Sequence, residues 1–303
     1  MNRRRFSQAL ATAAVGAVTS ELSSLAETSR KAQTAETPFP LSVMLWTIEG
    51  KLPFERRLEM VAEAGYHNVE LVGEYRDWTA VDFAKANAAR KRLKLSFDAT
   101  AGLGHGIGDP AVRDAFLAEL KQAMTPMETL GCPAMIVLSG NVVPGLSREA
   151  QHQSSIEGLK RAAELVEGRS IDGQPVRLLL ECIDQEENPK YFLQRASEAI
   201  DVVAAVGHPQ VQFLYDIFHQ QIAEGNLIEK LEKHIDMIGL IHVADVPGRH
   251  QPGTGEINYR NIYRKLAELK YRRMAAMEFR PSGETVATLR SARAMVAESV
   301  RGA

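Results

Sequence analysis

Eight short apolar runs, separated by stretches of helical periodicity, constrain the fold of this chain more than any other feature. The runs have the length of buried strands, and they lie at residues 41–48, 68–73, 94–99, 134–139, 176–183, 211–217, 237–244 and 273–279. Strands that alternate with helices form βαβ units, whose parallel sheet is buried on both faces. Eight such units in about 260 residues predict an α/β fold, a single-domain (β/α)₈ TIM barrel.

The stretches between the runs begin and end as helices do. Residues 53–65 start with Pro53, which suits a first helical turn, and stop at Gly65. The stretches 110–131, 147–168 and 188–207 also end on glycine, and we expect helices there. A doubly wound open sheet is the alternative, but no glycine-rich phosphate-binding turn follows the first strand.

The composition is that of an ordinary globular protein, and it excludes some classes of function. The 303 residues carry a formal net charge of -2, whereas a dedicated nucleic-acid binder needs a basic face to neutralise phosphates. Cys132 and Cys182 are the only cysteines. They are too few for a disulfide framework and lack metal-site spacing, so we expect both to be buried.

The first 35 residues are set apart from the barrel. Arg3, Arg4 and Phe6 precede a short apolar run at residues 9–18, and small residues offer a cleavage site after Ala26. The run is too short to cross a bilayer, which indicates an export signal and not a membrane anchor. It resembles the bacterial twin-arginine signal, and a disordered basic tail is the alternative. We therefore expect residues 1–35 to be a leader, residues 36–303 the barrel, and the protein to be periplasmic.

Polar residues interrupt four consecutive apolar runs close to their ends. They are Glu181, Asp216, His242 and Glu278. Each is costly to bury without a partner, and the carboxyl ends of barrel strands meet at one mouth, where active sites form. We expect the four side chains to converge there, with Trp46 and Glu70 lining the same mouth.

Three carboxylates and one imidazole suit a hard or borderline divalent cation. Oxygen-rich sets of this kind bind Mn²⁺, Mg²⁺ or Co²⁺, while the absence of cysteine ligands argues against structural zinc. Buried carboxylates repel one another unless a cation lies between them. The pattern therefore predicts a metal site.

The glycine-rich stretch 102–108 lacks the spacing of a nucleotide-binding loop, so we expect a surface loop that brings His105 near the mouth.

Four segments carry a family resemblance. They read LLLECIDQEENP, LYDIFHQQIAEGNL, GLIHVADVPGRHQPGTGEINY and MEFRPSG, and they resemble the hydroxypyruvate isomerases of the xylose isomerase-like barrel superfamily. The resemblance covers roughly residues 41–290 and is most specific in the third segment. Ketose 3-epimerases share the same four-ligand frame.

The resemblance implies roles for individual residues. A divalent metal would be held by Glu181, Asp216, His242 and Glu278, and the two glutamates would also transfer protons. Glu187, His219 and Arg249 match positions that contact substrate in these families.

Three positions depart from the isomerase pattern. His242 stands where the isomerases commonly have Gln and the epimerases have His, and the usual Glu-Pro-Ile-Asn of the fifth strand reads Glu181-Cys182-Ile183-Asp184 here. These departures leave the identity of the substrate open.

The reaction that the resemblance implies is the interconversion of hydroxypyruvate and 2-hydroxy-3-oxopropanoate through an enediolate. The alternatives are a ketose 3-epimerase or other sugar isomerase and a non-enzymatic sugar-binding barrel; the related AP endonucleases need more histidine ligands.

The partners follow from this chemistry. A metal that polarises a carbonyl acidifies the neighbouring C–H, and a flanking carboxylate can move that proton. Arg249 could bind a substrate carboxylate with two hydrogen bonds. We expect a small hydroxy-keto acid or sugar as substrate and neither nucleic acid nor a stable membrane anchor, and the sequence is compatible with a homo-oligomer.

Overall fold

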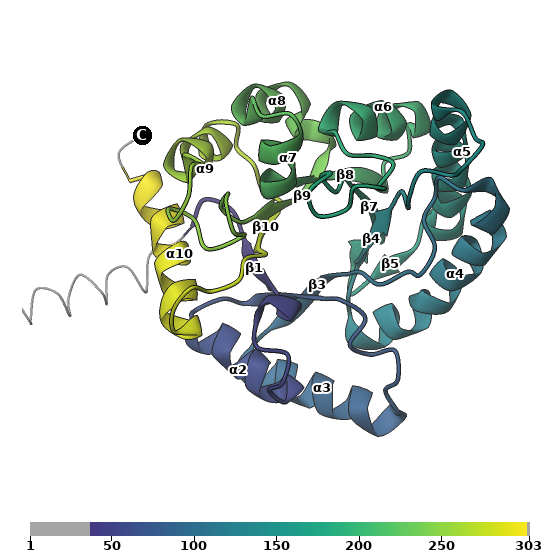
Figure 1. Ribbon diagram of the computed structural model, residues 1–303. Coiled ribbons are helices and arrows are strands. Elements are labelled where there is room, and N and C mark those ends of the chain that lie inside the picture. Colours follow the sequence, from purple (N-terminus) through teal and green to yellow (C-terminus); the bar gives the residue numbers. More distant parts are fainter. Residues whose placement is uncertain (1–36, 302–303) are drawn as a thin grey trace, which may run out of the picture.

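The computed structural model describes residues 37–301, and in it eight parallel strands close into a barrel surrounded by helices (Figure 1). The barrel strands are β1 (Leu41–Met44), β2 (Asn68–Leu71), β3 (Ser96–Thr100), β4 (Ala134–Leu138), β7 (Arg177–Glu181), β8 (Val211–Asp216), β9 (Ile238–Val243) and β10 (Met274–Met277). Neighbours follow the chain order, and β1 closes the ring against β10 with Leu41 opposite Ala275. The predicted TIM barrel is confirmed.

The outer helices are α2 (Phe54–Glu63), α3 (Ala80–Leu93), α4 (Arg113–Leu130), α5 (Arg148–Val166), α6 (Ala196–Val206), α7 (Ile217–Ala223), α8 (Leu227–His234), α9 (Tyr259–Glu268) and α10 (Thr285–Ser299). Side chains cap the first turn of several of these helices: Thr79 and Asp82 form a capping box on α3, and Ser147 caps α5. A short hairpin of β5 (Ser170–Ile171) and β6 (Gln174–Pro175) lies outside the barrel sheet. Within residues 37–301, no helix has the length and apolar character needed to cross a membrane.

Several predicted elements are shorter than expected. The first strand stops at Met44 and is followed by a 3₁₀ turn, Leu45–Thr47. The helix predicted over 188–207 begins only at Ala196. The preceding backbone bonds instead to the loop after β4, where Val142 N donates to Lys190 O at 2.8 Å and Phe192 N to Gly140 O at 3.0 Å. Those bonds use the groups that a helix would need.

Strand alternation decides which side chains enter the barrel. The interior is filled by small and branched side chains, which are Met44, Ala99, Ala134, Ile136, Leu179, Leu214, Leu240 and Ala276. Since side chains on a strand alternate between faces, the residue two positions further along also points inward. Leu179 is followed in this way by Glu181, and Leu240 by His242. The apolar layer therefore forms a floor beneath a polar layer at the carboxyl ends of the strands.

Both cysteines are buried and unpaired, as expected. The glycine-rich stretch lies between β3 and α4 and is packed against the loop after β4. Ile107 is completely buried, and its N–H donates to Leu138 O at 3.0 Å.

Candidate metal centre

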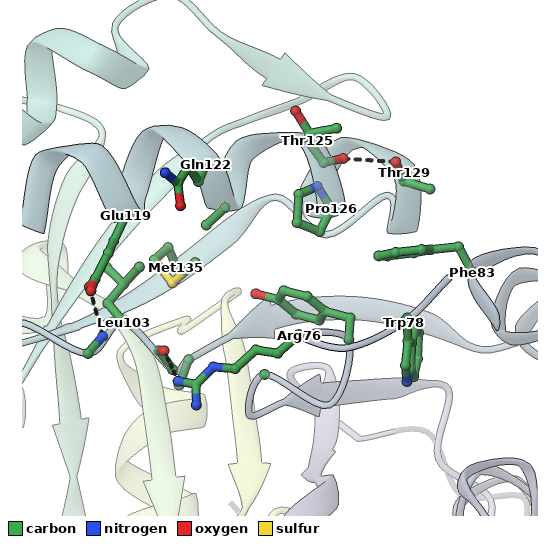
Figure 2. A pocket seen from close by; sticks show the side chains of 16 residues that line it. Arg76, Trp78, Phe83, Leu103, Glu119, Gln122, Thr125, Pro126, Thr129 and Met135 are labelled. Carbon is green, nitrogen blue, oxygen red and sulfur yellow. Dashed lines mark hydrogen bonds between the residues drawn. The ribbon is translucent and has the colours of Figure 1, made fainter. Parts of the chain in front are cut away.

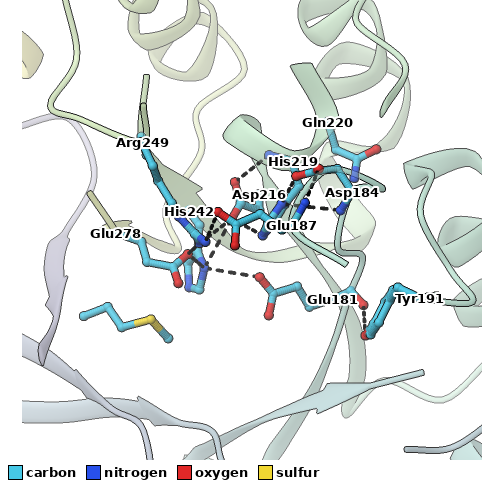
Figure 3. A network of polar contacts seen from close by, with 12 residues as sticks. Glu181, Asp184, Glu187, Tyr191, Asp216, His219, Gln220, His242, Arg249 and Glu278 are labelled. Atoms are coloured by element: carbon cyan, nitrogen blue, oxygen red, sulfur yellow. Dashed lines mark hydrogen bonds and ion pairs between the residues drawn. The ribbon is translucent and has the colours of Figure 1, made fainter. Parts of the chain in front are cut away.

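The four polar residues at the strand ends form one cluster. Each of Glu181, Asp216, His242 and Glu278 offers one ligand atom, and these atoms lie within 4.8 Å of one another (Figure 3). All four residues are buried, with exposed fractions of 0–7%. The expected convergence is thus present, whereas the roles of these residues in binding and catalysis stay predictions.

Three of these side chains are held through one atom and present the other to the cluster. Asp216 caps α7 by accepting from the backbone N–H of His219 through Oδ1 at 3.2 Å. Glu278 accepts from Trp46 Nε1 through Oε1 at 3.0 Å. His242 is bonded through Nε2 to Glu70 Oε2 at 2.9 Å. The atoms left facing the cluster are Asp216 Oδ2, Glu278 Oε2 and His242 Nδ1.

Those three atoms make no hydrogen bond of acceptable geometry, although they are buried. They lie instead in close charge contacts: His242 Nδ1 is 2.7 Å from Glu278 Oε2 and 3.6 Å from Glu181 Oε1. Buried polar atoms without hydrogen bonds are rare and point to an absent water or ion. Three carboxylates and one imidazole nitrogen are also a suitable donor set for a divalent cation. The residues therefore fit the implied metal.

Burial and mutual charge shift the pKa values of the cluster in opposite directions. Burial raises the pKa of Asp216 above its usual range. Burial alone would lower the pKa of His242, but the negative charges of Glu278 and Glu70 outweigh it and raise that pKa well above normal. Burial would raise the pKa of Glu278, yet the positive charges of Arg249 and His242 hold it far below its usual value. Without a metal, the cluster is balanced by imidazolium and guanidinium charge.

Arg249 reaches this cluster from the loop after β9. Its Nη2 lies 2.8 Å from Glu278 Oε2, and its Nη1 lies 3.5 Å from Glu187 Oε1. The guanidinium also stacks between Trp46 and Phe218, 5.3 Å and 5.1 Å from the two ring centroids. Arg249 thus lies beside the predicted metal ligands, whereas its role in substrate binding stays a prediction.

The loop that carries Arg249 is organised by a carboxylate whose role the sequence did not reveal. Asp245 is completely buried and accepts backbone hydrogen bonds from Gly253, Gly255 and Ile257 at 2.8–3.1 Å. Arg280 N further donates to Arg249 O at 2.7 Å. Aspartate is common in turns because it bonds nearby N–H groups, but only the structure shows one residue closing so long a segment.

His219 and Glu187 also lie beside the cluster. His219 is buried in the first turn of α7, with Nδ1 2.5 Å from Asp184 Oδ2 and Nε2 3.5 Å from Asp216 Oδ2. Glu187 lies in the loop after β7 with a side chain that is 39% exposed. Both are close to the predicted metal ligands, as Figure 3 shows.

Two expectations about neighbouring residues are wrong. Glu70 does not line the mouth, because its side chain is fully buried and contacts His242 from inside the barrel. His105 bonds to Glu119 through Nδ1 at 2.7 Å and takes no part in the cluster. Glu119 instead lines a separate cavity of about 510 Å³ beside α4, together with Arg76, Trp78 and Phe83 (Figure 2). None of the four cluster residues lines that cavity.

Comparisons with known proteins agree with this geometry. The chain is 31% identical over 245 residues to a 2-oxo-tetronate isomerase of Haemophilus influenzae, covering 79% of this chain and 92% of the relative. It is 28% identical over 255 residues to a hydroxypyruvate isomerase of Escherichia coli, covering 82% and 96%. The solved structure of an AP endonuclease, family 2, from Brucella melitensis is 28% identical, with a TM-score of 0.75 over 82% of this chain and 96% of that one.

The family model of the xylose isomerase-like TIM barrel matches residues 58–298, which is most of the chain. This match confirms the resemblance seen in the four sequence segments. The chain belongs to the xylose isomerase-like TIM barrel family, and its relatives in that family include hydroxypyruvate isomerases.

Proposed function

We propose that this protein is a metal-dependent isomerase of the hydroxypyruvate isomerase type. The observation that carries the proposal is the buried cluster of Glu181, Asp216, His242 and Glu278, with ligand atoms within 4.8 Å of one another. Relatives with this barrel are named hydroxypyruvate isomerase and 2-oxo-tetronate isomerase. The finer reaction is the interconversion of hydroxypyruvate and 2-hydroxy-3-oxopropanoate.

The four side chains would hold a divalent ion such as Mn²⁺, Mg²⁺ or Co²⁺. When bound, such an ion polarises a substrate carbonyl and makes the adjacent C–H more acidic. The remaining chemistry belongs to the chain. Glu181 and Glu278 have carboxylate oxygens within reach of a carbon placed between them, so one would remove a proton and return it to the neighbouring carbon.

Arg249 supports a keto acid as substrate. Its guanidinium is stacked between two aromatic rings and lies at the edge of the cluster. A planar guanidinium held in this way binds a carboxylate through two parallel hydrogen bonds. Hydroxypyruvate and 2-oxo-tetronate both carry a carboxylate next to the reacting centre, whereas a ketose does not.

The substrate is tested by proton exchange with solvent. The Mg²⁺-loaded enzyme is incubated in D₂O with hydroxypyruvate, with 2-oxo-tetronate and with a panel of ketoses, and deuterium incorporation is followed by NMR. We expect deuterium in a keto acid and conversion to its isomer. Deuterium only at C3 of a ketose would support the epimerase alternative, and exchange in none of them would support a binding protein.

The proton-transfer role is tested with Glu278→Gln. An amide oxygen still ligates a metal but accepts no proton at neutral pH. We expect metal binding to persist while kcat falls by about 10²–10⁴-fold. Glu232→Gln is the control, because Glu232 only pairs with Lys265 on the surface. Near-normal turnover in Glu278→Gln would refute the role.

We also propose export to the periplasm by the twin-arginine route. The support is the sequence Arg3-Arg4-Arg5-Phe6 before a short apolar run, which lies outside the described residues. A fusion of residues 1–40 to a reporter should reach the periplasm, and blocking the twin-arginine route should retain it in the cytoplasm. Export that persists under the block would contradict the proposal.

A further inference from the structure

Asp184 is one of the residues at which this chain departs from the isomerases that it resembles, where the resemblance leads us to expect Asn. It follows β7 by three residues, and its side chain is completely buried. Figure 3 shows it close to two residues that the family resemblance places against substrate, His219 and Glu187.

The carboxylate of Asp184 holds both of these residues. Its Oδ1 accepts from the backbone N–H groups of Glu186 at 2.7 Å and Glu187 at 3.0 Å. Its Oδ2 lies 2.5 Å from Nδ1 of His219. One buried side chain therefore fixes the loop that carries Glu187 and the ring of His219.

The distance of 2.5 Å locates a proton of the imidazole. A carboxylate oxygen and an unprotonated ring nitrogen would face each other with lone pairs, which repel at this separation. The backbone N–H of Asp184 also approaches Nδ1, but at 3.4 Å, and that weaker contact would need a lone pair on the same nitrogen. Burial would raise the pKa of Asp184, but hydrogen bonds from His219 and the loop lower it. Asp184 is thus the acceptor, and Nδ1 carries the proton.

An amide in this position would give the opposite arrangement. The oxygen of Asn could still accept from the two loop N–H groups, but its NH₂ would face Nδ1. That nitrogen would then have to be the acceptor, and the ring would keep its proton on Nε2. Whether position 184 is Asp or Asn therefore decides whether Nδ1 of His219 carries a proton.

We propose that Asp184 is a positioning residue that keeps a proton of His219 on Nδ1 and orients Nε2 toward a substrate oxygen beside Asp216. The inference rests on the proposed function, because it assumes that substrate is turned over beside Asp216. Nε2 already faces that side, 3.5 Å from Asp216 Oδ2.

The chain contains a matched control away from the cluster. Glu119 accepts from the backbone N–H groups of Gly104 at 2.8 Å and His105 at 3.1 Å, and its other oxygen lies 2.7 Å from Nδ1 of His105. These contacts are of the same kind as those of Asp184, but Glu119 lies on α4 and its partners lie in a partly exposed loop. Glu119→Gln therefore reproduces the chemical change of Asp184→Asn at a site without a predicted role in the reaction.

The first measurement does not need turnover. Two-dimensional ¹H–¹⁵N NMR of the full-length, Mg²⁺-loaded protein labelled in histidine reports which ring nitrogen is protonated. We expect a proton on Nδ1 of His219 in the wild type and an unprotonated Nδ1 in Asp184→Asn, while Glu119→Gln changes only the signals of His105. An unchanged His219 pattern in folded Asp184→Asn would overturn the proposal.

The second measurement is kinetic and separates this inference from the proposed function. We expect Asp184→Asn to lower kcat/KM by about tenfold to a hundredfold with unchanged Mg²⁺ affinity, and Glu119→Gln to match the wild type. In a His219→Gln background, Asp184→Asn should have little further effect, and an undiminished loss there would overturn the proposal. If the wild type turns over none of the substrates, the proposed function fails, whereas the NMR result still decides the position of the proton.

Discussion

Glu70 on β2 is bonded to Nε2 of His242 on β9 at 2.9 Å, across the interior of the barrel. Both side chains are completely buried. Because a carboxylate accepts the Nε2 proton, Nδ1 is left to face Glu181, Asp216 and Glu278. Carboxylates behind a histidine ligand fix its tautomer and ring orientation in many metal sites. Glu70 therefore supports the candidate metal centre, although it offers no ligand atom.

Removing the Glu70 carboxylate should weaken metal binding. We expect Glu70→Leu to lower Mn²⁺ affinity by about 10–100-fold, while Glu70→Gln loses less because its oxygen still accepts from Nε2–H. Isothermal titration calorimetry gives both values. Asp98→Asn is the control, since Asp98 is another buried carboxylate in the barrel and bonds to Ser42 at 2.6 Å. Wild-type affinity in folded Glu70→Leu would contradict this account.

Metal binding should release a proton. The pKa of His242 lies well above its usual range because the charges of Glu278 and Glu70 outweigh burial, so the metal-free protein carries an imidazolium at neutral pH. A metal ion needs the lone pair on Nδ1 and must displace that proton. Lowering the pH stabilises the imidazolium and should weaken binding, and raising the pH should strengthen binding until His242 is neutral.

Calorimetry in two buffers with different ionisation enthalpies measures this release. We expect about one proton per ion in the wild type at neutral pH and less release in His242→Gln, whose amide has no proton to lose. Binding heats that do not depend on the buffer would show that His242 is already neutral.

Arg249→Lys should separate keto acids from sugars. Lysine keeps the charge, but it loses the planar donor pair and the stacking on Trp46 and Phe218. We expect KM for a keto acid to rise by about 10–100-fold, which corresponds to a lost charged hydrogen bond. Arg260→Lys, at an exposed pair with Glu298, should leave KM unchanged. A larger effect on ketoses than on keto acids would indicate a sugar substrate.

The sequence predicted the barrel and the cluster because both depend on local periodicity. An apolar run with one acidic residue or histidine near its end identifies an inward-facing side chain at a known level of the barrel, as at Glu181 and His242. The helix expected over 188–207 begins only at Ala196, because the loop after β4 forms hydrogen bonds with the backbone groups that precede it. That contact joins segments about 50 residues apart, so no local pattern reports it.

The supporting carboxylates were missed for a related reason. Glu70 and Asp184 are recognisable as acidic residues near strand ends, but their partners, His242 and His219, lie 172 and 35 residues away. Only closure of the barrel brings them together. The departure from Asn at Asp184 was visible in the sequence, whereas its consequence for His219 was not.

The loop that carries Arg249 should be sensitive to a single methyl group at Gly255. A Cβ at this position would lie 2.0 Å from Val246 O and 2.7 Å from Asp245 Oδ1, closer than any real contact. The backbone would have to move, and the bond from Gly255 N to Asp245 Oδ2 at 3.0 Å would be distorted. We expect Gly255→Ala to destabilise the fold by about 1–3 kcal/mol and to lower kcat/KM by displacing Arg249.

Gly50→Ala is the control for Gly255→Ala, because no heavy atom lies within 4 Å of a Cβ built at Gly50. Scanning calorimetry and steady-state kinetics measure both effects, and a Gly255→Ala variant with the Tm and kcat/KM of the wild type would show that the loop does not hold Arg249 in place.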